Sequence, residues 1–166
     1  MARWAAARCG KVRIVIGGSR KLPEGKAPFL LIRFLGALPD DAVVMLRCPY
    51  TEGNLPGPFE RDVADLCDAL NIPVEWHAPA PTILNPGRVS VYIRDIDMVA
   101  KASLVLLFFT KEDAEDGYSG THHLMDKALD QNIPMYAYIV ANDGFVSRWG
   151  EHDPENFYGD LVPAAS

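Results

Sequence analysis

The chain has 166 residues, 49% of them hydrophobic, and its formal net charge at pH 7 is -6. A chain of this length and composition can bury an ordinary core, so we expect one domain. The acidic balance argues against a protein that grips nucleic-acid backbones over a broad surface, because such binding depends on clustered Lys and Arg.

The first ten residues, 1–10, are expected to form an N-terminal arm outside the folded domain. Their scattered Arg and the lack of a long apolar run argue against a secretory signal, and no later segment reaches membrane-spanning length. Cys9, Cys48 and Cys67 have neither zinc-ligand nor disulfide-framework spacing. We therefore expect a cytoplasmic protein with no metal site, no cofactor and no membrane partner.

The first half of the chain predicts three strands and two helices. Short apolar runs bounded by Gly or Pro indicate strands at 11–16, 42–46 and 74–77. Helices are indicated by an apolar run at 27–38 and by three- and four-residue spacing of apolar residues at 59–70. The Gly- and Pro-rich loop that follows the second strand is long for a compact domain, and such loops are often functional.

The second half is organised around a continuous apolar run, 103–109, which predicts a strand buried on both faces. A helix at 88–101 precedes this strand, and a polar loop at 110–120, a helix at 121–133 and a strand at 134–140 follow it. This order and spacing are typical of a right-handed βαβ unit. The segment 142–166 carries aromatic residues without a strong period, so we expect a tail that packs on the domain or on a partner subunit.

Five strands separated by helices predict an α/β fold over residues 11–141, a doubly wound five-stranded parallel sheet of the Rossmann-like type. The expected strand order is 3-2-1-4-5, which reverses direction between strands one and four. Ligands bind outside the carboxyl ends of the strands at such a reversal. Two Gly-containing turns, 17–20 and 117–121, are then expected to lie side by side.

The first of these turns contains residues suited to an anion. Gly17 and Gly18 let the backbone turn sharply and approach a ligand, Ser19 can donate a hydrogen bond, and Arg20 can pair with phosphate or carboxylate. An ordinary strand-to-loop turn would contain the same residues. Neither G-x-G-x-x-G nor a P-loop is present, so ATP or GTP hydrolysis is not expected.

The second turn leads from Gly117 into a predicted helix through Ser119, Gly120 and Thr121. Its hydroxyls and the free N–H groups of the helix can receive a phosphate or a ribose. Simple N-capping by Ser119 or Thr121 explains the same residues without a ligand. The two histidines that follow point about 100° apart on a helix, so they do not suit a single metal ion.

Charged residues elsewhere are open to two interpretations. Glu60 and Glu112 are candidates for a catalytic acid or base, although the first can equally complement a helix dipole and the second can belong to a solvated loop. Arg94 is a candidate ligand-binding residue, and a surface ion pair with Asp97 is an equally good explanation of its presence.

Three motifs together resemble the SLOG superfamily of Rossmann-like proteins over roughly residues 11–140. They are GGSR after the first strand, RDIDMVAKASLVLLFF at 94–109 and GYSGTHHLMDKALDQNIPM at 117–135. This superfamily includes the cytokinin-activating LOG phosphoribohydrolases, DNA-processing protein A and small YspA-like proteins of bacteria and phages. The resemblance implies a nucleotide or nucleotide-derived ligand held by the two turns, with Arg94 matching an Arg of the YspA-like members.

Departures from this pattern leave the activity open. LOG enzymes, like the similar nucleoside 2-deoxyribosyltransferases, carry a Glu in a G-T-x-x-E motif, and Leu124 occupies that position here. The alternatives are cleavage of an N-glycosidic bond assisted by Glu60 or Glu112, a deoxyribosyltransferase-like enzyme without the usual Glu nucleophile, and a non-catalytic nucleotide sensor or interaction protein. We also expect a homo-oligomer.

Overall fold

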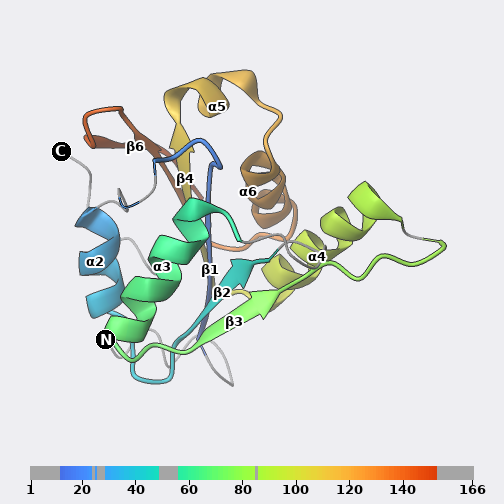
Figure 1. Ribbon diagram of the computed structural model, residues 1–166, viewed down its shortest axis with the longest axis horizontal. Helices are drawn as coiled ribbons and strands as arrows, with labels where there is room; N and C mark the ends of the chain where they lie inside the picture. Colours follow the sequence, from blue (N-terminus) through green and yellow to red (C-terminus); the bar gives the residue numbers. More distant parts are fainter. Residues whose placement is uncertain (1–11, 24, 26–28, 49–55, 85, 153–166) are drawn as a thin grey trace.

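The sheet at the centre of the molecule has six strands in the order β3-β2-β1-β4-β5-β6 (Figure 1). The computed structural model describes residues 12–23, 25, 29–48, 56–84 and 86–152. The strands are β1 (Arg13–Gly18), β2 (Val43–Arg47), β3 (Val74–His77), β4 (Leu104–Thr110), β5 (Met135–Val140) and β6 (Val146–His152). The helices are α2 (Phe29–Gly36), α3 (Pro58–Ala69), α4 (Gly87–Lys101), α5 (Lys111–Asp116) and α6 (Gly120–Asp130).

The predicted α/β class, the parallel pairing and the order of the first five strands are confirmed. The predicted number of strands is wrong, because β6 pairs antiparallel with β5 as a sixth strand. A tight turn closed by the N–H of Gly144 donating to the Ala141 carbonyl joins the two. β6 is a half-exposed edge strand without a continuous apolar run, which is why its residues look like a tail in the sequence.

Three sequence predictions fall partly or wholly outside the described residues. They are the N-terminal arm at 1–10, most of the Gly- and Pro-rich loop at 47–58, and the end of the predicted tail at 153–166. The part of the tail that is described, up to His152, packs on the domain as β6.

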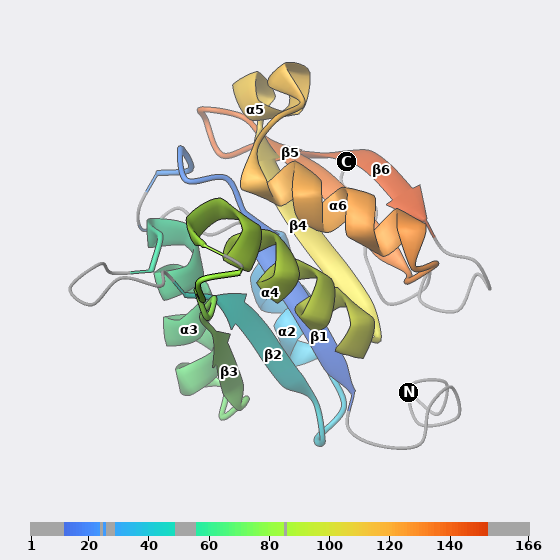
Figure 2. The ribbon, with the colours of Figure 1, turned by 90° about the vertical axis from the view of Figure 1, so that its right-hand side faces the viewer.

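The core lies on both faces of the sheet because successive side chains of a strand point to opposite faces. In β4, residues 104, 106 and 108 join a cluster with α2 and α3, and residues 105, 107 and 109 join a cluster with α4 and α6. Figure 2 shows α4 and α6 side by side in front of the sheet. The β4 run is therefore apolar throughout, as expected for a parallel strand covered on both sides.

The segment after β4 is more ordered than the sequence predicts. Its first part forms α5, a short helix, rather than the predicted polar loop. Thr110 caps α5, its hydroxyl accepting a hydrogen bond from the N–H of Asp113 at 3.1 Å. A six-residue helix with one buried side chain has no apolar stripe, so its periodicity gives no signal.

Cys67 lies in the core between α3 and the sheet, and burial raises the pKa of its thiol to about 12. Because the thiolate is the reactive form, Cys67 is expected to resist a thiol reagent at pH 8 in the folded protein and to react after denaturation. Timed labelling of a variant with Cys9 and Cys48 replaced by Ser measures this directly. Fast labelling in native buffer would contradict the buried position.

Candidate functional site

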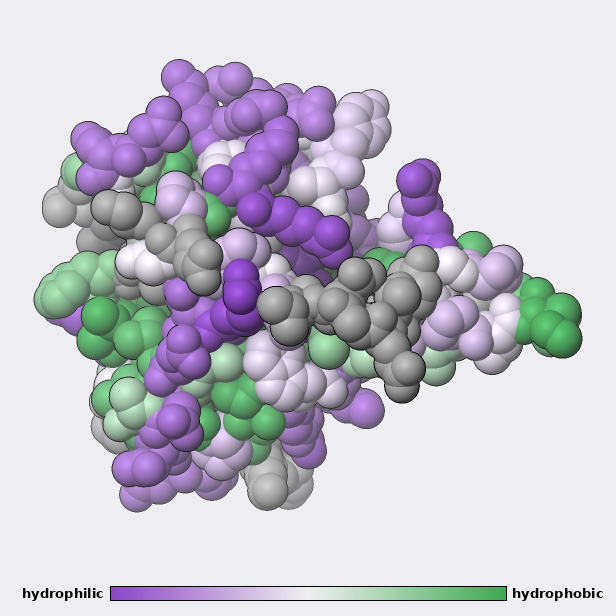
Figure 3. All heavy atoms as spheres, in the orientation of Figure 1, coloured by the Kyte–Doolittle hydropathy of each residue, from purple (hydrophilic) through white to green (hydrophobic). Residues whose placement is uncertain are grey.

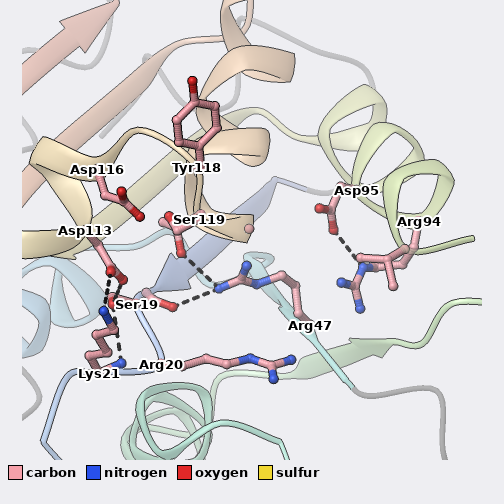
Figure 4. A pocket seen from close by; sticks show the side chains of 14 residues that line it. Ser19, Arg20, Lys21, Arg47, Arg94, Asp95, Asp113, Asp116, Tyr118 and Ser119 are labelled. Atoms are coloured by element: carbon pink, nitrogen blue, oxygen red, sulfur yellow. Dashed lines mark hydrogen bonds and ion pairs between the residues drawn. The ribbon is translucent and has the colours of Figure 1, made fainter. Parts of the chain in front are cut away.

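A cavity of about 390 Å³ lies at the carboxyl edge of the sheet, where the strand order reverses between β1 and β4 (Figure 4). Five parts of the described chain line it. They are the turn at 18–21, Arg47 at the end of β2, three α4 residues (Val91, Arg94 and Asp95), two α5 residues (Asp113 and Asp116), and the segment 118–121 that begins α6. The expected meeting of the two Gly-containing turns is confirmed.

The first turn is fixed by bonds to the β4 side of the cavity. The N–H of Ser19 donates to the carbonyl of Phe108 at 2.9 Å, and its hydroxyl donates to the carboxylate of Asp113. Lys21 forms an ion pair with Asp113 at 3.5 Å. The Ser19 side chain is therefore buried and engaged within the protein, while Arg20 beside it is exposed.

Arg47 lines the cavity and contacts three other parts of the chain, and the sequence prediction missed it. Its Nη2 atom lies 2.9 Å from the carbonyl oxygen of Gly18, 2.8 Å from a carboxylate oxygen of Glu60 and 3.4 Å from the hydroxyl of Thr121. A Cβ at Gly120 would lie 3.3 Å from Nη1, so glycine gives the guanidinium room. Its position at the carboxyl end of a predicted strand is the signal that could have identified it.

The start of α6 offers free N–H groups to the cavity. Ser119 caps the helix, its hydroxyl accepting from the N–H of His122 at 3.3 Å. The N–H groups of Gly120 and Thr121 belong to the first turn and have no intrahelical acceptor. Arg20, which has no ion-pair partner among the described residues, lines the same cavity. Together these groups can hold an anion.

His122 anchors the capped end of α6 against the last strand. Its ring lies 4.7 Å from that of Phe109 in β4 and 5.8 Å from that of Trp149 in β6, centroid to centroid. Phe109 and Trp149 also meet edge to face at 4.9 Å. β6, which the sequence does not predict, therefore supports the start of α6 at the cavity.

Arg94 lines the cavity but is held by the protein. Its Nη1 donates to the carbonyl oxygens of Cys48 at 2.9 Å and His77 at 3.2 Å, and its Nε donates to Asp95 at 2.7 Å. Asp95, rather than the expected Asp97, is its ion-pair partner. Burial lowers the pKa of Arg94, and the charge of Asp95 opposes that shift. The other carboxylate oxygen of Asp95 lies 3.0 Å from Nδ1 of His123, within hydrogen-bonding distance.

The two carboxylates expected to serve in catalysis do not line the cavity. Glu60 is buried against Arg47, and Glu112 is an exposed residue whose carboxylate lies 2.7 Å from Nζ of Lys21. The hydrogen bond to Glu112 raises the pKa of Lys21. Asp113 and Asp116 line the cavity instead, and neither is among the predicted site residues, although both belong to the acidic loop from which Glu112 was chosen.

Two glycines of the predicted site, Gly17 and Gly117, do not line the cavity. Gly17 lies inside β1, where a Cβ would come 2.8 Å from Leu124. Gly117 ends α5 with a positive φ of 78°. Gly17 and Gly117 therefore serve the packing and the turn of the backbone and do not contact a ligand in the cavity. Two residues that the sequence prediction did not include, Lys21 and Tyr118, do line the cavity.

No family model and no curated protein sequence matches this chain. The chemistry of the cavity therefore carries the functional argument. Among the described residues, no three His, Cys, Asp or Glu side chains are placed to hold a metal ion. In the same part of the chain, no helix has the length and apolar character needed to cross a bilayer.

Proposed function

We propose that the protein binds a nucleotide or nucleotide-derived small molecule in the cavity between β1, β4 and α6. The observation that carries this proposal is the convergence of Arg20, Arg47 and the free N–H groups of α6 on one cavity at the strand-order reversal. A phosphate placed there would meet two guanidinium groups and a helix dipole of favourable sign. The resemblance to SLOG proteins points to the same class of ligand.

The other lining residues suit the rest of such a ligand. A cavity of about 390 Å³ is near the lower end of the range for small-molecule sites, about 300–1,000 Å³, which favours a mononucleotide over a dinucleotide. Asp116 can accept hydrogen bonds from sugar hydroxyls, and Tyr118, which is largely exposed at the rim, offers a flat ring to a base.

Binding without turnover is favoured over cleavage of an N-glycosidic bond. A general acid must reach the leaving base, and both expected acids, Glu60 and Glu112, are paired with cations and absent from the cavity wall. Calorimetric titration with AMP, ADP-ribose and cyclic nucleotides should detect binding, and chromatography of the same mixtures should show intact ligand. Absence of heat with all of them would refute the proposed function. Release of free base would show that the protein is a hydrolase and not a non-catalytic sensor. Asp116 would then be the first residue to mutate in a search for the general acid.

Replacing Arg20 with Gln is expected to weaken AMP binding by about tenfold or more, because a hydrogen bond between charged groups contributes roughly 1.5–3 kcal/mol. The melting temperature should stay unchanged, since Arg20 is exposed and has no ion-pair partner among the described residues. Arg33→Gln is the matched control, because Arg33 is exposed on α2 and its loss changes the net charge equally. Equal loss of affinity in both variants would show that only overall charge matters.

A further inference from the structure

Helix α4 has a second apolar face that the described chain covers only in part. One face packs into the core through Met98 and Val99. The opposite face carries Val89, Tyr92, Ile93 and Ile96, which are 38–45% exposed and recur at three- and four-residue spacing. A surface helix ordinarily has one apolar stripe, directed at the core, so a second stripe indicates a second contact.

The apolar surface continues into the segment that precedes α4. Ile83 is 99% exposed and Leu84 is 89% exposed. The segment and the first turns of α4 project from the body of the molecule in Figure 1, and apolar atoms form the tip of the same projection in Figure 3. Six large side chains at these exposures present on the order of 600 Å² of apolar-residue surface, taking about 150–250 Å² for a fully exposed large side chain. A stable dimer buries about 800 Å² per partner, so the patch supplies most of an interface.

We propose that α4 pairs antiparallel with α4 of a second copy of this chain. A two-fold axis requires a surface that matches itself, and the stripe has this property. With the axis between Tyr92 and Ile93, Val89 faces Ile96 of the partner subunit, and Tyr92 faces Ile93 of the partner subunit. The exposed charges Arg88 and Asp97 fall on opposite edges of the stripe and leave its centre uncharged, as in the core of a protein interface. An unrelated partner would not require this symmetry.

The interface would adjoin the ligand cavity through one side chain. The ring of Tyr92 lies 4.6 Å from that of His123, centroid to centroid, and His123 contacts Asp95, which holds Arg94 at the cavity wall. The same helix therefore presents one face to a partner subunit and another to the ligand. Pairing of two α4 helices would hold the cavity wall formed by Arg94 and Asp95 in place. The proposed dimer does not depend on which ligand the cavity binds.

Sedimentation velocity of the full chain over a wide range of concentration tests the pairing. The wild-type protein should be a dimer, and Ile93→Asp should be a monomer with an unchanged far-UV spectrum, because a carboxylate at the centre of the interface would be buried without a partner. Phe29→Asp is the control, since Phe29 is 74% exposed and lies on α2, across the sheet from α4. A wild-type protein that stays monomeric at every concentration overturns the proposal, as does a dimer that survives Ile93→Asp.

Cross-linking provides a second measurement if the charged variant fails to fold. Ile93→Cys, made with Cys9 and Cys48 replaced by Ser, should form a disulfide-linked dimer under mild oxidation, because both copies of residue 93 lie next to the two-fold axis. Phe29→Cys in the same background should not. Linkage through position 29 and none through position 93 would place any dimer contact elsewhere and reject the α4 interface.

Discussion

Replacing Arg47 with Met is expected to lower the free energy of unfolding by about 3–5 kcal/mol, because the change leaves the buried carboxylate of Glu60 without its cation. The two side chains are 13% and 5% exposed and lie 2.8 Å apart, so solvent screens the pair only weakly. Arg47 also holds the Gly18 carbonyl and the Thr121 hydroxyl. Urea unfolding of the two proteins measures the difference.

A second substitution separates the structural role of Arg47 from its proposed role in binding. The double variant Arg47→Met with Glu60→Gln removes the uncompensated charge and should recover a large part of the lost stability. It should still fail to bind AMP, because the guanidinium is absent. Arg33→Met, which removes an exposed cation from α2, should change stability by no more than about 0.5 kcal/mol. If the double variant is as unstable as the single one, the unpaired charge of Glu60 is not the cause of the lost stability.

Gly18→Ala should be the most harmful glycine substitution at the site. A Cβ at this position would overlap the ring of Phe59, with its Cε1 atom at 2.8 Å. That ring is buried at the start of α3 and packs against Phe108, so it cannot turn aside. Overpacking of this kind costs about 1–3 kcal/mol, and it should also disturb the Gly18 carbonyl that accepts from Arg47.

Gly36→Ala is the matched control for this prediction. Gly36 ends α2, and a Cβ there would meet open space. The change should leave stability unchanged or raise it by up to about 1 kcal/mol, since Ala is the better helix former. The denaturation midpoints of the two variants should therefore move in different directions from the wild type, or only that of Gly18→Ala should move. Similar losses in both would show that the contact with Phe59 is not the cause.

Most of the fold could be predicted because burial leaves a direct pattern in this chain. The run at β4 is apolar on both faces, and α3 repeats its buried residues at helical spacing, so the ends of the predicted helices and strands differ from those observed by no more than three residues. β6 and α5 were missed for the opposite reason. Few of their side chains are buried, and their stability comes from pairing with β5 and from a cap at Thr110, which leave no periodic pattern in the sequence.

The candidate site could be predicted only where it consists of local turns. The residues at 18–20 and 119–121 do line one cavity, as the expected strand order requires. The partners of Arg47, Glu60 and Glu112 could not be predicted from the sequence, because tertiary contacts set them. Glu60 lies 13 residues from Arg47 in the sequence, and Glu112 lies 91 residues from Lys21. From the sequence alone, each carboxylate is available for catalysis, whereas in the fold each one forms an ion pair with a distant cation.

The contact of Trp149 with His122 has a consequence for how the protein is made. β6 follows every other described helix and strand in chain order, yet Trp149 packs on the residue that completes the cap of α6. As domains fold during synthesis, the earlier strands can assemble while β6 is still inside the ribosome. Nascent chains arrested before Val146 has emerged would then have a nearly complete sheet and an unsupported first turn of α6. Competence to receive an anion would be among the last properties that the growing polypeptide acquires.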